Sequence, residues 1–255
     1  MTSALVSIGV AGSLGPDATA RVASAAQAAG LHALWVNDTP GGDSLASLAA
    51  AARVTDALVL ATGVIPVDRR PPASFVDALR ALPHDRLTLG VGSGQARAGA
   101  LALVRNAVAE LRELTSARLL VGALGPRMRE LAVADADGPL LSWLTPALAG
   151  AQAQAAHAAR AHAHVALYVR AALDPAATGR LDAEAARYAG YPAYAAHFAR
   201  LGVAAGDTVL APERFAAGIP PYRDAVDEVV LRAITATDDV DEYVRFVDRA
   251  AELLA

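Results

Sequence analysis

The chain has 255 residues, of which 55% are hydrophobic, and its 22 basic and 26 acidic residues give a formal net charge of −4. This composition supports a large apolar core and excludes a disordered chain. The absence of cysteine excludes disulfides, thiolate metal sites and cysteine nucleophiles, and no clustered basic face predicts nucleic-acid binding.

Strand-like runs alternate with helix-like patterns along the chain, which predicts an α/β fold with a parallel sheet. The helix pattern at 18–29 ends at Gly30, a residue suited to the left-handed C′ position, and Asp17 and Asp43 are expected N-caps. Further helices are predicted at 43–55, 72–82, 101–114, 126–134 and 240–254. The strand candidates are 5–10, 33–37, 57–65, 86–91, 118–123, 139–144, 164–171 and 228–234.

Eight strands are the number of a (β/α)8 TIM barrel, and a length of about 250 residues is typical of that fold as a single domain. We therefore expect one barrel domain over residues 1–255, with a doubly wound open sheet as the alternative. Residues 175–221, with a helical pair around 190–194, predict an excursion between strands 7 and 8. Its aromatic residues recur at helical spacing, which favours packing against the barrel over a lid.

Neither of the two long uncharged runs is typical of a membrane or targeting segment. Residues 1–16 lack the basic start of a signal peptide, and residues 138–159 contain prolines, glutamines and a histidine. A cytoplasmic protein without membrane contact is expected.

The motifs of several enzyme classes are missing. The sequence contains no Gly-X-Ser-X-Gly elbow and no P-loop, so hydrolase and kinase functions gain no support. His157, His162 and His164 are spaced by five and two residues, which does not place them on one helical face. No metal site is expected.

Four phrases of the sequence carry a family resemblance. They are GLHALWVND at 30–38, LATGV at 60–64 with RPP at 70–72, LTLGVGSG at 87–94, and VGALGPRM at 121–128 followed by ADG at 136–138. In this order and spacing the chain resembles the bacterial luciferase-like family of flavin- and deazaflavin-dependent oxidoreductases. The resemblance implies an enzyme that uses coenzyme F-420 or FMN on a small-molecule substrate, often as a homodimer.

The third predicted strand contains the central site phrase, Thr62, Gly63 and Val64. By resemblance, a non-prolyl cis peptide lies between Gly63 and Val64, in a bulge that backs the ring of the cofactor. The missing side chain of Gly63 would then let the backbone face the ring. The alternative is a strand glycine that accommodates a bend of the barrel.

Two turns are candidates for the rest of the cofactor. Gly92, Ser93, Gly94 and Gln95 follow strand 4 and offer backbone amides and a hydroxyl, although an ordinary strand–helix turn would look the same. The second turn starts a helix at Pro126, which makes it a candidate phosphate site with Arg127 as the charge partner, unless Arg127 is only a solvated charge. This second phrase comprises Ala123, Leu124, Gly125, Pro126, Arg127 and Met128.

Asn37 and Asp38 end strand 2, and the resemblance places an acidic residue here beside the redox ring. Thr39 and Gln95 stand where deazaflavin dehydrogenases of the family carry a histidine and an acid. Asp38 is therefore the single catalytic candidate. A non-catalytic flavin-binding relative, or a barrel without cofactor, is the alternative function.

Overall fold

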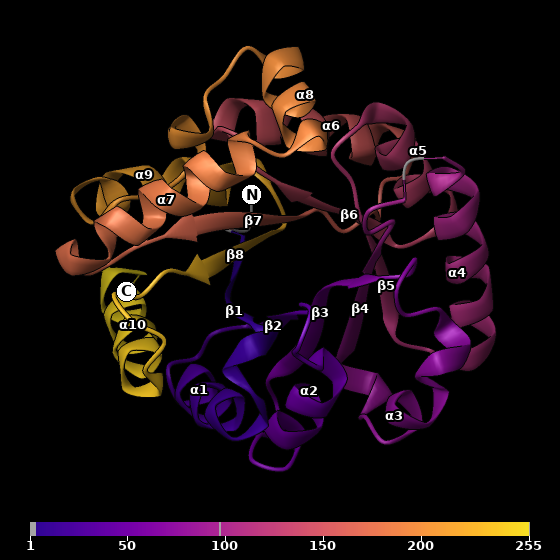
Figure 1. The fold of residues 1–255 in the computed structure, drawn as a ribbon, viewed down its shortest axis with the longest axis horizontal. Coiled ribbons are helices and arrows are strands. Elements are labelled where there is room, and N and C mark those ends of the chain that lie inside the picture. Colours follow the sequence, from indigo (N-terminus) through magenta and orange to yellow (C-terminus); the bar gives the residue numbers. More distant parts are fainter. Residues whose placement is uncertain (1–3, 97, 255) are drawn as a thin grey trace.

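Eight parallel strands close into a barrel in the computed structural model, which describes residues 4–96 and 98–254 (Figure 1). Neighbours in the chain are neighbours in the barrel, and β8 pairs back onto β1. The predicted TIM barrel is confirmed, and the open sheet is wrong. The strands are β1 (Leu5–Ala11), β2 (Ala33–Asn37), β3 (Val59–Pro66), β4 (Leu87–Gly92), β5 (Arg118–Gly122), β6 (Gly138–Ser142), β7 (Ala166–Ala171) and β8 (Glu228–Ala233).

Helices follow the strands and surround the barrel (Figure 1). Asp43 caps α2 as predicted, because its carboxylate accepts the amides of Leu45 and Ala46. Gly15 and not Asp17 precedes α1, which begins at Pro16. The helices are α1 (Pro16–Ala28), α2 (Ser44–Ala52), α3 (Val76–Arg80), α4 (Ala100–Leu114), α5 (Pro126–Asp135), α6 (Pro146–Ala159), α7 (Thr178–Ala189), α8 (Pro192–Leu201), α9 (Pro212–Ala225) and α10 (Val240–Leu254).

The predicted helix at 72–82 is interrupted. Residues Pro72–Ser74 form a 3-10 turn, and α3 starts only at Val76. The excursion between β7 and β8 contains the predicted helical pair, α7 and α8. Its Pro-rich passage forms α9 with Pro220 and Pro221 inside the helix, where a sequence pattern would normally end it.

Within the described residues, the buried hydrophobic side chains form three clusters. The largest lies between the outer faces of the strands and the surrounding helices. A second lies under α7 and α8, where Phe198 packs against Trp143 after β6 and Tyr188 and Tyr194 are partly buried. Packing is therefore confirmed for these three aromatic residues of the excursion, whereas Tyr191 is exposed. The third fills the barrel interior and includes Trp35 and Tyr168, whose rings meet edge to face at 5.9 Å.

A buried carboxylate, Glu228, closes the amino-terminal end of the barrel interior. Its Oε1 accepts hydrogen bonds of 2.6 Å from the Ser7 hydroxyl and the Trp35 indole, and its Oε2 lies 2.8 Å from Nε2 of His164. Burial alone would raise the pKa of Glu228, but the His164 contact and the two hydrogen bonds outweigh it and lower the pKa. The carboxylate is therefore satisfied and supports the barrel.

In the described part of the chain, no helix combines the length and the apolar character that crossing a membrane requires.

Candidate functional site

The barrel interior opens toward solvent at the carboxyl ends of the strands. Inward-facing residues one step deeper, such as Gly9, Leu120 and Val230, are buried. The last inward-facing residues of six strands are instead half-buried, and we call them the barrel mouth. They are Ala11, Asn37, Val64, Gly122, Ser142 and Arg232.

The predicted cis peptide between Gly63 and Val64 is present, and the register between β3 and β4 shifts there as in a bulge. The missing side chain of Gly63 has a different use from the one expected. A Cβ at Gly63 would lie 2.3 Å from the Tyr168 hydroxyl, so the glycine makes room for Tyr168 across the barrel. The ring of Tyr168 thus forms the floor below the mouth.

Val64 occupies the β3–β5 side of the mouth. A Cβ at Gly92 or at Gly122 would approach the methyl groups of Val64 to 2.9 Å. The two glycines therefore leave space for this valine, which stays half-buried. This side of the mouth presents a small apolar surface.

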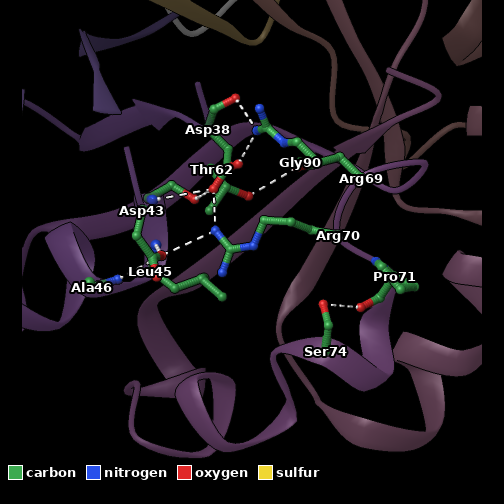
Figure 2. A network of polar contacts seen from close by, with 11 residues as sticks. Asp38, Asp43, Leu45, Ala46, Thr62, Arg69, Arg70, Pro71, Ser74 and Gly90 are labelled. Atoms are coloured by element: carbon green, nitrogen blue, oxygen red, sulfur yellow. Dashed lines mark hydrogen bonds and ion pairs between the residues drawn. The ribbon is translucent and has the colours of Figure 1, made fainter. Parts of the chain in front are cut away.

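Thr62 and Asn37 fix the backbone around this surface. The Thr62 hydroxyl is fully buried and donates to the Gly90 carbonyl at 3.0 Å, so it ties β3 to β4 and is not available to a ligand (Figure 2). The amide of Asn37 donates to the Gly63 carbonyl. Of these two predicted cofactor residues, only Asn37 lies at the mouth.

Asp38 is held by two arginines from the segment after β3. Its buried carboxylate pairs with Arg69 through one oxygen and with Arg70 through the other (Figure 2). Ser44 donates to it from its hydroxyl at 2.8 Å and from its backbone amide at 3.3 Å. Arg70 also reaches Asp43 at 3.1 Å.

This network defines what Asp38 can do. Both oxygens of its carboxylate already accept hydrogen bonds, from two guanidinium groups and the Ser44 hydroxyl. The geometry makes Asp38 an anchor between the loop after β2 and the loop after β3. Its catalytic role stays a prediction without support from these contacts.

The turn after β4 already contains a carboxylate. Oδ2 of Asp68 accepts the amide of Gln95 at 2.8 Å. Gly94 has φ of 59°, and a Cβ there would lie 1.8 Å from Oδ1 of Asp68. Glycine is required at this position, and the negative charge of Asp68 opposes a phosphate on the amides of Ser93 to Gln95.

The turn after β5 is better suited to an anion than the turn after β4. Gly125 precedes the Pro126 start of α5 without a side-chain cap, so first-turn amides stay available to an anion. Arg127 is exposed, Ala123 is buried, and Met128 packs against the core. The predicted phosphate residues are therefore brought together at the helix start, except for Ala123 and Met128, which pack inward.

Two further arginines lie at this turn that the sequence did not indicate. Arg129 and Arg200, from α5 and α8, donate to the Leu124 carbonyl at 3.0 and 2.9 Å. Burial and the nearby charge of Arg200 lower the pKa of Arg129. Sequence spacing offers no signal for Arg200, because it reaches the turn from 76 residues downstream.

His197 joins α8 to the ends of β5 and β6. Its Nε2 lies 3.1 Å from the Trp143 carbonyl, and Arg200 reaches its Nδ1 at 2.9 Å. Nδ1 also lies 3.3 Å from the Leu124 carbonyl, but the shorter contact is with the guanidinium, which can only donate. With Nδ1 accepting from Arg200, the ring is neutral and carries its proton on Nε2. Burial, partly offset by the Trp143 hydrogen bond and reinforced by Arg200, lowers the pKa of His197.

We expect acid to destabilise the protein through His197. Because its pKa in the folded state lies below the ordinary histidine value of about 6.5, its stabilising contribution is complete above that pH and is lost as the pH falls toward the folded pKa. Urea unfolding at about pH 7.5 and about pH 5.5 measures the loss. His197→Gln offers one donor and one acceptor but does not titrate, so its loss of stability between the two pH values should be smaller. Equal losses in wild type and variant would exclude His197 as the cause.

The β6–β8 side of the mouth is polar and cationic. Arg170 donates to the Ser142 hydroxyl, and its guanidinium stacks 3.9 Å from the ring centroid of Trp143. Arg232 donates to the Ala233 carbonyl and is half-buried. Arg170 and Arg232 were not among the predicted site residues, although their spacing of two from Tyr168 and Val230 is a signal for inward-facing positions.

Comparisons with known proteins agree with this fold. The luciferase-like monooxygenase family model matches residues 3–113, and no curated protein matches the chain. An F420-dependent secondary alcohol dehydrogenase, in complex with an F420–acetone adduct, is similar at a TM-score of 0.76 and 15% identity, with 100% of each chain covered. Monooxygenase RslO1 from Streptomyces bottropensis has a TM-score of 0.69 and 18% identity, with 98% of each chain covered. Riboflavin lyase with modified FMN and riboflavin has a TM-score of 0.70 and 12% identity, and the match covers 99% of this chain and 91% of the lyase chain.

Proposed function

We propose that the chain is a member of the luciferase-like monooxygenase family, whose model matches residues 3–113, and that it is an oxidoreductase dependent on FMN or coenzyme F-420. It would transfer hydride to or from a small organic substrate, or activate oxygen toward it. The observation that carries the proposal is the barrel mouth, with an apolar side around Val64 and a polar side on β6–β8.

The residues of the mouth fit the ring of such a cofactor. The half-buried Val64 side chain, held over Gly92 and Gly122, offers a surface for one face of a planar ring. Asn37 fixes the Gly63 carbonyl beside it. When bound, the cofactor supplies the hydride or oxygen chemistry, and the protein supplies position and electrostatics.

The phosphate of either cofactor fits the turn after β5 better than the turn after β4. Arg127, Arg129 and Arg200 place positive charge around the start of α5, whereas Asp68 places a carboxylate on the Gln95 amide. We therefore assign the phosphate to Leu124–Arg127. The amides after Gly92 would contribute only if Asp68 moved.

Replacing Arg127 with alanine should weaken binding of FMN or coenzyme F-420 by about ten- to a hundredfold, because a charge-assisted hydrogen bond contributes roughly 1.5–3 kcal/mol. Riboflavin, which lacks the phosphate, should lose much less. Arg249→Ala on the outer helix α10 is the matched control. Equal losses of affinity for FMN and riboflavin would show that the phosphate does not bind at Arg127.

The mouth offers no obvious proton donor or acceptor. Its six residues include neither an acid nor a histidine, and Asp38 is engaged by Arg69 and Arg70. The proposed reaction therefore depends on the cofactor for its reactive group. A non-catalytic flavin-binding relative or a barrel without cofactor is the second candidate, and the Asp68 carboxylate at a predicted cofactor turn is the observation that favours it.

Titration of the purified protein with FMN and with coenzyme F-420, followed by cofactor absorbance and fluorescence, tests the proposal. Saturable binding of one cofactor supports the enzyme, and reduction of the bound cofactor by a substrate series identifies the reaction. Absence of binding for both favours the barrel without cofactor. A cytoplasmic location and a homodimer complete the proposal.

A further inference from the structure

Two arginines lie side by side at the mouth on neighbouring strands. Arg170 of β7 and Arg232 of β8 are register partners in the parallel ladder. Partners in a parallel ladder place their side chains on the same face. Tyr168 and Val230, two positions earlier, belong to the interior cluster, so both arginines follow the inward-facing rows.

The positive charge of this pair is incompletely neutralised. Arg170 lies 3.4 Å from Glu184 of α7, and Glu184 is also 3.6 Å from Arg187. Among the described residues, no carboxylate lies within ion-pair distance of Arg232. Arg69 and Arg70, by contrast, share the carboxylate of Asp38.

A neutral hydrogen-bond donor lies below the pair. The Tyr168 hydroxyl is buried and has no hydrogen-bond partner within the described residues. Tyr168 precedes Arg170 by two positions on the same inward-facing row of β7, and its register partner Val230 precedes Arg232 in the same way on β8. An unpaired donor and two adjacent cations in a partly closed mouth favour an oxyanion.

We propose that the β7–β8 side of the mouth binds an oxyanion group of the substrate, a carboxylate or a phosphate, with Arg232 as its principal partner. The assignment to a substrate rests on the proposed function, in which the cofactor ring lies on the Val64 side and its phosphate lies at α5. Arg232 is placed to contact the ligand because it is half-buried and carries no carboxylate. Arg170 is buried and held by Ser142 and Trp143, so it adds positive charge to the site without contacting the ligand directly.

Calorimetric titration with malonate and with inorganic phosphate tests this assignment in a buffer free of competing oxyanions. Malonamide is the neutral control for malonate. Each probe is titrated into the cofactor-free protein and into the cofactor-saturated protein. The variants are Arg232→Met and, as the matched surface control, Arg249→Met, whose arginine pairs with Glu252 on α10.

Wild-type protein should bind at least one of the two anions in both arms and should not bind malonamide. In the cofactor-saturated arm, where the cofactor phosphate occupies the turn before α5, Arg232→Met should weaken anion binding by at least about tenfold, while its affinity for the cofactor stays within about threefold of wild type. Arg249→Met should change neither. If Arg232→Met does not fold, Arg232→Gln removes the same charge with a polar side chain.

Three results would overturn the proposal. They are wild-type protein that binds neither anion, equal anion affinity in Arg232→Met and wild type, and a parallel loss of cofactor affinity, which would assign the oxyanion to the cofactor. If neither FMN nor coenzyme F-420 binds, the proposed function and with it the substrate assignment fail. The cofactor-free arm would then still decide whether this arginine pair binds oxyanions.

Discussion

Asp38→Asn is expected to lower the free energy of unfolding by about 3 kcal/mol, because removing one charge of a buried ion-pair network leaves its partners uncompensated. The Asp38 side chain is fully buried, and its carboxylate bridges Arg69 and Arg70. An amide cannot replace both charged contacts. Urea denaturation measures the loss, and the two loops that Asp38 joins should become more accessible to proteolysis.

Asp43→Asn is the matched control, since Asp43 also contacts Arg70 but its side chain is 53% exposed. Asparagine is a good N-cap, so this variant should lose no more than a few tenths of a kcal/mol, about the scale of an exposed ion pair. If Asp38→Asn instead keeps wild-type stability and abolishes turnover of the cofactor-loaded protein, Asp38 is a catalytic acid or base and not an anchor.

Gly63→Ala is expected to destabilise the protein by about 2 kcal/mol, because overpacking a well-filled core costs about 1–3 kcal/mol. The added Cβ would lie 2.3 Å from the Tyr168 hydroxyl and 2.8 Å from its ring carbons. Tyr168→Phe removes the hydroxyl oxygen, which has no hydrogen-bond partner in the described residues, and by itself should change stability little.

The double variant Gly63→Ala/Tyr168→Phe should therefore recover part of the loss. A favourable coupling of about 0.5 kcal/mol or more in the double-mutant cycle would show that the two positions meet across the barrel. Strict additivity would contradict that contact. Loss of cofactor affinity in Gly63→Ala without any loss of stability would instead support the original expectation that Gly63 faces the ring.

The sequence predicted the barrel well because its signals are local and periodic. Each strand is a short apolar run between helix patterns, and Asp43 and Gly30 mark the helix ends that the structure contains. The start of β7 was predicted too early. The predicted strand began at His164, which contacts Glu228, whereas the strand begins at Ala166. The break before α3 was also missed.

Contacts between distant positions explain what could not be predicted of the site. Arg69 and Arg70 lie 31 and 32 residues after the Asp38 that they bind, and no local pattern links them. Asp68 gave no signal in the sequence, because the Gln95 amide that it accepts lies 27 residues further along the chain. The sequence does not show that Arg170 and Arg232 are neighbours, because their proximity depends on the register between β7 and β8.

The measurement that most directly tests the barrel mouth as the cofactor site is equilibrium binding of FMN and coenzyme F-420 to Val64→Trp, with Val54→Trp as control. Val64 is half-buried at the mouth, whereas Val54 is 48% exposed just beyond the end of α2. An indole at position 64 should cover the apolar side of the mouth and weaken binding by at least about tenfold, while Val54→Trp binds like wild type. Equal affinity in both variants, with the fold intact by circular dichroism, would place the cofactor elsewhere and contradict the proposed function of this mouth.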